Sequence, residues 1–117
     1  MKIAVYGQNY QNESNLKAFE ILVNCLTNYK TQVFVESKFL EIQKETYHND
    51  WSFGIFKELD NSYDLFISIG GDGTILRAIT YVRDLDIPIV GINTGRLGFL
   101  ATVQTNEIKD ALSDIFN

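Results

Sequence analysis

The chain has 117 residues, of which 45% are hydrophobic, and it carries 10 basic and 15 acidic side chains. The length fits one domain, and the net charge of -5 argues against general nucleic-acid binding, which depends on Lys and Arg. A single cysteine excludes an internal disulfide framework, and no apolar run is long enough for a membrane span. These features predict a cytoplasmic domain with neither nucleic-acid nor membrane partners.

Two strands and a helix are expected in the first third of the chain. Residues 2–6 form a short apolar run that Gly7 ends, which is typical of a buried strand. Between residues 16 and 26 the apolar side chains recur at steps of three and four, which predicts an amphipathic helix, and residues 32–35 predict a second strand. Residues 38–60 are charged and irregular, so we expect a short helix near 39–46 and then a loop or a second short helix.

The pattern is sharper after residue 64. A nearly continuous apolar run over residues 65–69 predicts a fully buried strand that ends at Gly70-Gly71. A helix is expected to begin near Thr74. Its apolar stripe consists of Ile75, Leu76, Ile79 and Val82.

The last third of the chain continues the alternation of strands and helices. Pro88 opens a strand over residues 87–92, where a missing N–H group is tolerated, and Thr105 is expected to cap a final helix. Such alternation predicts an α/β fold with an open, mostly parallel sheet of about four strands and helices on both faces. Residues 1–117 then form one domain, with a ligand crevice beyond the carboxyl ends of the strands.

The most informative segment is the loop Gly70-Gly71-Asp72-Gly73-Thr74. Its glycines let the backbone approach a ligand closely, and the N-terminus of the following helix favours an anion. Two standard nucleotide motifs do not fit. A Walker A loop requires Lys directly after its last Gly, where Thr74 stands, and the dinucleotide fingerprint requires a third Gly at the position of Leu76. The loop still predicts a phosphate-bearing ligand.

Asp72 is unusual in a loop of this kind, because its carboxylate repels an anionic ligand. The repulsion is relieved if Mg²⁺ bridges the two groups or if the carboxylate handles a proton. Either role fits phosphoryl transfer to a hydroxyl group. The alternative is that Asp72 is an ordinary turn or N-cap residue.

Two segments of the chain resemble the signatures of NAD kinases. The pentapeptide at residues 70–74 resembles their GGDGT motif, which recurs loosely in diacylglycerol and sphingosine kinases and in 6-phosphofructokinases. Residues 91–100, with the sequence GINTGRLGFL, resemble the second NAD kinase signature, and residues 2–7 resemble the first strand of that family. The order and spacing of the two signatures favour NAD kinases, and the resemblance covers essentially the whole chain.

The resemblance implies ATP-dependent phosphorylation of the adenosine 2′-hydroxyl of NAD⁺, which gives NADP⁺. Asp72 would be the general base that takes the hydroxyl proton, and Gly73 would lie against the pyrophosphate. The implied nucleotide-binding residues are Gly70, Gly71, Asp72, Gly73, Thr74, Arg77, Asn93 and Phe99. The simpler alternatives are a solvated charge for Arg77, a turn residue for Asn93 and core packing for Phe99.

The resemblance also implies ligands and a longer protein. NAD⁺ and ATP are the expected partners, and Mg²⁺ is expected to arrive with ATP and to lie near Asp72 without a metal site of its own. NAD kinases continue into a C-terminal all-β domain and form homo-oligomers. We therefore expect the chain to be an N-terminal domain, weakly active or inactive alone. The rival hypotheses are the catalytic half of a lipid kinase of the diacylglycerol or sphingosine type, and a non-catalytic flavodoxin-like nucleotide-binding domain.

Overall fold

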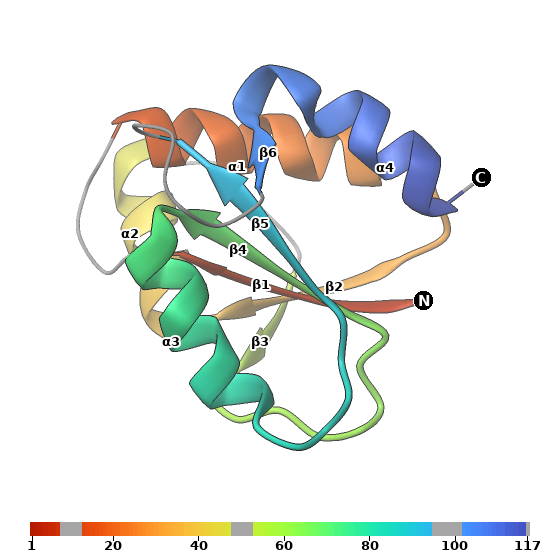
Figure 1. Ribbon diagram of the computed structural model, residues 1–117. Coiled ribbons are helices and arrows are strands. Elements are labelled where there is room, and N and C mark those ends of the chain that lie inside the picture. The colour runs from red at the N-terminus through yellow and green to blue at the C-terminus, as the bar shows by residue number, and fades with distance from the viewer. Residues whose placement is uncertain (8–12, 48–52, 95–101, 117) are drawn as a thin grey trace.

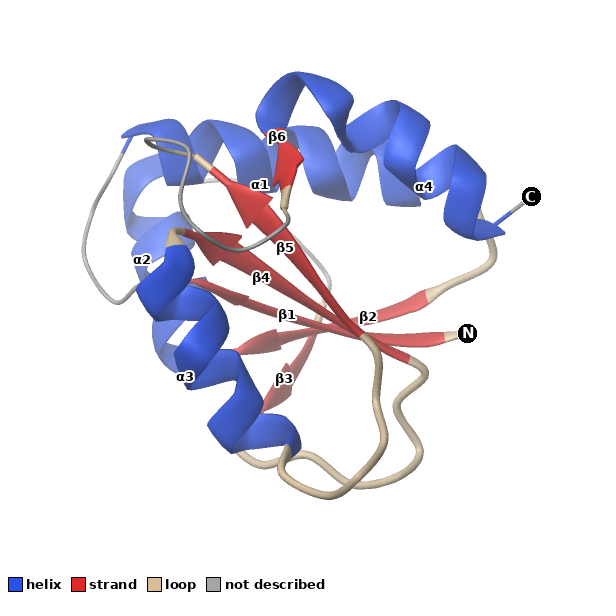
Figure 2. Cartoon of the chain, viewed as in Figure 1, coloured by secondary structure: helices blue, strands red, loops and turns tan. Residues whose placement is uncertain are grey.

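In the computed structural model, the strands form one parallel sheet with helices on both of its faces (Figures 1 and 2). The structure describes residues 1–7, 13–47, 53–94 and 102–116. The strand order is β3-β2-β1-β4-β5-β6, and each neighbouring pair runs parallel. The strands are β1 Lys2–Gly7, β2 Gln32–Glu36, β3 Gly54–Phe56, β4 Leu65–Gly70, β5 Ile89–Asn93 and β6 Val103–Gln104.

Three of the helices connect consecutive parallel strands, and the fourth ends the described chain. They are α1 Glu13–Leu26, α2 Ser37–Tyr47, α3 Asp72–Val82 and α4 Ile108–Phe116, and a short 3₁₀ helix, Thr105–Glu107, precedes α4. The predicted class, an open parallel α/β sheet with helices on both faces, is confirmed.

The sheet has six strands, so the expected number of about four was too low. The two missing strands are β3, with three residues, and β6, with two. The loop or second short helix expected after residue 46 is wrong where β3 lies. Both strands sit at the sheet edges, where they are too short to show a hydrophobic period.

The two faces of the sheet have different cores. Ile3 and Val5 of β1 point into a core that α1, α2 and α4 complete, whereas Ala4 and Tyr6 point into a second core that α3 covers. Figure 1 shows the same division, with α1 and α4 together on one face and α3 on the other. The second core is rich in aromatic rings, among them Tyr6, Phe56, Phe66 and Tyr81.

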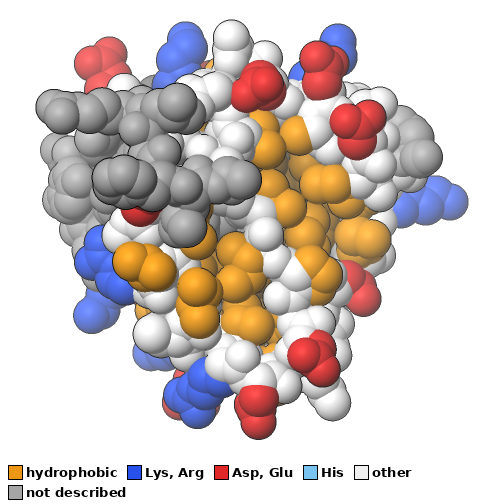
Figure 3. Space-filling view, viewed as in Figure 1, with side chains coloured by type: hydrophobic (Ala, Val, Ile, Leu, Met, Phe, Trp, Pro, Cys, Tyr) orange, Lys and Arg blue, Asp and Glu red, His pale blue; other side chains and the backbone are white. Residues whose placement is uncertain are grey.

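Helix α3 packs through a stripe that shares Val82 with the expected one but not Leu76 or Ile79. Its buried residues are Thr74, Ala78 and Val82, whereas the side chains of Leu76 and Ile79 are 57% and 49% exposed. Small side chains at steps of four allow the helix to approach the sheet closely, which turns the larger residues outward. Hydrophobic side chains accordingly gather on the surface seen in Figure 3, between α3 and α4.

The beginnings of β5 and α4 differ slightly from the expectation. Pro88 precedes β5 instead of opening it, and its carbonyl accepts a hydrogen bond from the N–H of Phe66. Thr105 lies in the 3₁₀ helix Thr105–Glu107 that precedes α4, and the N-cap of this 3₁₀ helix is Gln104. The Glu107 carboxylate accepts the N–H of Gln104 at 2.9 Å, so this cap contact belongs to the 3₁₀ helix and not to α4.

Candidate functional site

The candidate site lies where the order of strands reverses. β1 and β4 are neighbours in the middle of the sheet, although α1, β2, α2 and β3 separate them in sequence. The helices that follow these two strands leave toward opposite faces, so a crevice opens beyond the carboxyl ends of β1 and β4. The Gly70–Thr74 loop emerges at these carboxyl ends, as the sequence predicts.

Gly70 joins the sheet to the loop in a backbone conformation that suits glycine. Its φ is 152°, in a region that other residues rarely adopt. Gly70 pairs with Asn93 in the β4–β5 register, and its carbonyl accepts the N–H of Thr94 at 3.2 Å. These contacts hold the end of β4 against the end of β5.

Helix α3 begins at Asp72, two residues earlier than expected, with Gly71 as its N-cap. The Gly71 carbonyl accepts the N–H groups of Thr74 and Ile75 at 3.1 and 3.3 Å. The first turn therefore consists of Asp72, Gly73 and Thr74, and it presents the positive end of the helix dipole at the crevice. This arrangement is suited to an anion.

No steric contact with the described residues requires glycine at positions 71 and 73. A Cβ atom built at either position meets no atom of the described residues within 4 Å, and neither residue has a positive φ. The fold alone would accept alanine at both positions. The space next to these backbones is open, which is the geometry that close approach of a phosphate requires.

The other predicted binding residues differ in their exposure. Arg77 is exposed, one helical turn beyond Gly73. Thr74 is completely buried, and its Oγ1 has no hydrogen-bond partner among the described residues, so its hydroxyl faces the protein. Asn93 is 2% exposed at the end of β5. Phe99 belongs to residues 95–101, which lie outside the described residues. The ligand contacts of all four remain predictions.

Sequence reasoning missed the polar link between α1 and the end of β5. The Thr94 hydroxyl donates a hydrogen bond to the Oδ1 atom of Asn15, which is itself buried in the first turn of α1. The two residues are 79 positions apart, and although Thr94 belongs to the signature at residues 91–100, no local pattern marks Asn15 or pairs it with Thr94. Together with the bond from Thr94 to Gly70, this contact ties three segments together at the site.

A second missed group lies under α3, beside the carboxyl ends of β1 and β2. Burial raises the pKa of Tyr6, the charge of Arg77 lowers it and that of Glu36 raises it. Burial also raises the pKa of Tyr81, with the charge of Glu36 as the next cause. Glu36 is 5% exposed, and its carboxylate accepts the N–H of Phe39 at 2.9 Å. An acidic residue closing a predicted strand was the available signal for this group.

Within the described ranges, no group of three or more His, Cys, Asp or Glu side chains is placed to hold a metal ion. A search of the same ranges finds no helix with the length and apolar character that crossing a bilayer demands. The described part of the site thus offers one carboxylate, Asp72, near the expected phosphates. One carboxylate fits Mg²⁺ that is held mainly by substrate phosphates.

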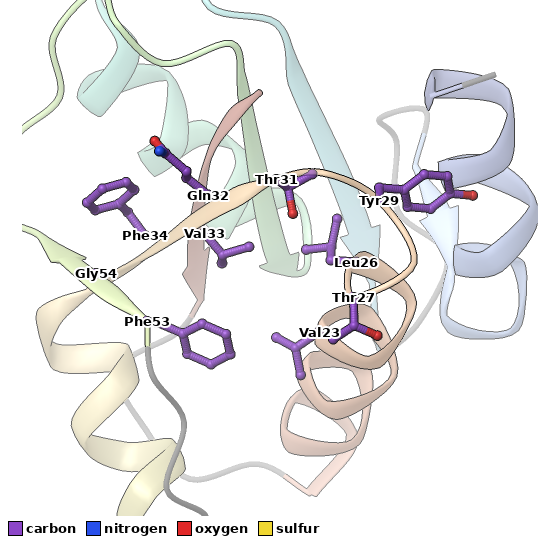
Figure 4. A pocket seen from close by; sticks show the side chains of 10 residues that line it. All are labelled: Val23, Leu26, Thr27, Tyr29, Thr31, Gln32, Val33, Phe34, Phe53 and Gly54. Atoms are coloured by element: carbon purple, nitrogen blue, oxygen red, sulfur yellow. The ribbon is translucent and has the colours of Figure 1, made fainter.

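An apolar cavity of about 540 Å³ lies far from this site (Figure 4). Val23 and Leu26 of α1, Val33 of β2 and the Phe53 ring line it. It opens beside the amino end of β2 and the carboxyl end of α1. This is the end of the sheet opposite to Asp72. We therefore do not assign it to the candidate site.

The fold and this site define a parallel α/β domain with a glycine-rich turn and a helix N-terminus at the crossover point of the sheet, a geometry suited to an anionic ligand. A family model described as ATP-NAD kinase N-terminal domain matches residues 3–117. The chain belongs to this family.

The relatives agree with this membership, and a solved structure shares the fold. The chain is 48% identical over 122 residues to the NAD kinase of Christiangramia forsetii and 48% identical over 115 residues to that of Flavobacterium psychrophilum. The matches cover 98% and 96% of the chain but 40% and 39% of the relatives, so the chain spans about 40% of their length. The crystal structure of yeast NADH kinase complexed with NADH has a TM-score of 0.75 and 20% identity, over 99% of this chain and 38% of that one, and shares the fold.

Proposed function

We propose that the chain is the N-terminal domain of an NAD kinase, which transfers a phosphoryl group from ATP to the adenosine 2′-hydroxyl of NAD⁺. The observation that carries the proposal is the placement of Asp72 between two open glycines, at the start of α3 and at the crossover point of the sheet. Membership of the family and the names of the relatives support the reaction.

In this proposal Asp72 is the general base. Its carboxylate accepts the proton of the 2′-hydroxyl while that oxygen bonds to the γ-phosphorus and the bond to the bridging oxygen breaks, which releases ADP. Gly71 and Gly73 leave room for the phosphates against the first turn of α3, and Arg77 faces them as a cation. Mg²⁺ bound with ATP supplies neutralisation of phosphate charge.

The remaining part of the site is proposed to come from a C-terminal all-β domain. The relatives are longer than this chain, which supports a further domain in the complete enzyme. By itself the 117-residue chain is then weakly active or inactive, and homo-oligomers are proposed for the complete enzyme.

The test is a chimera in which this chain replaces the matching part of the Christiangramia forsetii relative. We expect the chimera to form NADP⁺ from NAD⁺ and ATP. Asp72→Asn keeps the shape of the side chain but removes the proton acceptor, so kcat should fall about a thousandfold, within the usual range for a general base. Asp114→Asn, an exposed position on α4, is the matched control and should leave kcat unchanged.

Two other outcomes would favour the rival hypotheses. Phosphorylation of diacylglycerol or sphingosine in place of NAD⁺ would identify a lipid kinase. Full turnover by Asp72→Asn would remove the base role and leave Asp72 as a turn residue.

A further inference from the structure

A cavity of about 490 Å³ lies beside the carboxyl ends of β2 and β3. Its lining comes from four parts of the chain, and we call it the β2–β3 cavity. The lining residues are Glu36, Ser37, Lys38, Glu41, Lys57 and Tyr81. The volume lies within the range of small-molecule sites, and the cavity opens at the same edge of the sheet as the Asp72 turn.

Glu36 gives this cavity an acceptor that is held in place. The residue closes β2, is 5% exposed and accepts the N–H of Phe39 with its Oε2 atom at 2.9 Å. An ionised carboxylate has two oxygens that only accept hydrogen bonds, so one backbone donor does not exhaust it. A buried, oriented carboxylate at the wall of a cavity is suited to bind hydroxyl groups.

Helix α3 connects the cavity to the Asp72 turn. Gly73, Arg77 and Tyr81 follow each other at steps of four, so they form one row along the helix. The row is about 12 Å long, from a rise of 1.5 Å per residue. In Figure 1, α3 runs across the sheet from the end of β4 toward β3. The Tyr81 ring accordingly lies 5.0 Å from the Tyr6 ring and 6.2 Å from that of Phe56.

The charges differ between the cavity and the Asp72 turn, the two ends of the row on α3. At the cavity, Glu36 and Glu41 stand with Lys38 and Lys57, and Arg77 lies between the cavity and the open glycines. The two acidic and two basic side chains balance at the cavity, so its lining has no net charge to attract phosphates. A ligand with an uncharged, hydroxyl-bearing end and an anionic end matches both.

We propose that the β2–β3 cavity binds the nucleoside of the phosphoryl donor, with Glu36 accepting a ribose hydroxyl. The phosphates extend past Arg77 to the Gly71–Gly73 turn, where Asp72 and the acceptor hydroxyl meet the terminal phosphate. This inference rests on the proposed function, because it places the donor of that reaction. It assigns the β2–β3 side of Asp72 to the donor.

The test is calorimetric titration of the 117-residue chain with Mg·ATP and with Mg·tripolyphosphate. Glu36→Gln retains an acceptor for the Phe39 N–H but removes the charge, and it should weaken Mg·ATP about tenfold without weakening tripolyphosphate. Lys57→Met should weaken Mg·ATP by a similar factor. Lys109→Met, an exposed lysine on α4, is the matched control and should bind like the unmodified chain. Thermal melting by circular dichroism checks that each variant is folded.

Several results would overturn the proposal. One is a failure of the unmodified chain to bind Mg·ATP at millimolar concentration. Another is an affinity for Mg·ATP that neither Glu36→Gln nor Lys57→Met changes. The third is an equal loss of affinity for Mg·ATP and Mg·tripolyphosphate in Glu36→Gln. In the chimera, Glu36→Gln should raise KM for ATP and leave KM for NAD⁺ unchanged. A raised KM for ATP together with an active Asp72→Asn would reject the proposed base and keep the donor cavity.

Discussion

The glycines of the sheet interior and those of the β4–α3 turn differ in what surrounds them. A Cβ atom at Gly7 would lie 2.3 Å from the Phe39 ring, and one at Gly91 would lie 2.4 Å from the Ile75 side chain. At Gly71 and Gly73 the same atom meets no atom of the described residues within 4 Å. Packing explains glycine in the interior, whereas in the turn the proposed approach of a phosphate to the backbone would explain it.

This difference separates stability from function at single positions. An added methyl group in the interior must displace buried atoms, so its effect is on the free energy of unfolding. The same methyl group in the turn displaces no atom of the described residues, so we expect its effect to be on the proposed ligand binding. Alanine substitutions can therefore test whether the two groups of glycines differ in this way.

The largest effect on stability is expected for Gly7→Ala. The Phe39 side chain is 1% exposed and packs edge-on against Phe19, so it has little room to move. Overpacking of this kind should lower the free energy of unfolding by about 3 kcal/mol. Urea unfolding measures the change, and an unchanged midpoint would show that the ring moves freely.

Gly73→Ala is the matched substitution in the turn. Alanine within a helix is favoured over glycine by about 0.5–1 kcal/mol, so the free energy of unfolding should be equal or higher. The methyl group blocks phosphate approach, and kcat/KM of the chimera should fall about a hundredfold, the cost of a misplaced reactant. A lower free energy of unfolding with an unchanged kcat/KM would contradict both expectations.

The two sides of α3 provide a third, smaller contrast. Val82→Ala removes a buried side chain and should cost about 2 kcal/mol, whereas Leu76→Ala removes an exposed one and should change stability by less than about 0.5 kcal/mol. The same urea experiment measures both. Equal losses in the free energy of unfolding would favour the apolar stripe that the sequence predicts.

The smallest effect concerns the tyrosines of the second core and appears only at alkaline pH. Burial raises the pKa of Tyr6, Tyr63 and Tyr81 above the usual value of 10.0. The folded chain therefore keeps protons that the unfolded chain loses, and stability should fall as the pH rises above 10. Absorbance at alkaline pH follows the ionisation, and Tyr6→Phe should remove part of the late-titrating signal. Ionisation of all three at the pH of free tyrosine would contradict their burial.

The central strands and the helices could be predicted because they are long enough to show a period. The 65–69 run became β4, and the steps of three and four between residues 16 and 26 became α1. The edge strands β3 and β6 could not be predicted, since they form by pairing with a neighbour. The expected stripe of α3 was right at Val82 and wrong at Leu76 and Ile79, because hydrophobicity alone does not show how closely small residues such as Ala78 allow the helix to approach the sheet.

The candidate site was predictable to the extent that one loop contains it. Residues 70–74 are contiguous, and their placement at the carboxyl end of a central strand followed from the pattern. Asn15 and Glu36 were missed because their importance depends on which distant segments the sheet order brings together. The link from Asn15 to Thr94 exists only once α1 and β5 are in place.

The link between Asn15 and Thr94 limits how the site can open. Thr94 is fastened through its hydroxyl to α1 and through its amide to Gly70, so the end of β5 cannot separate from β4 while both bonds remain. The amide hydrogen of Thr94 should accordingly exchange with solvent deuterium at the slow rate of the central strands, although it lies just beyond the last residue of β5. The β4–β5 floor of the proposed site is therefore held in place by hydrogen bonds of the chain itself, and we expect ligand binding to need no prior ordering of this floor.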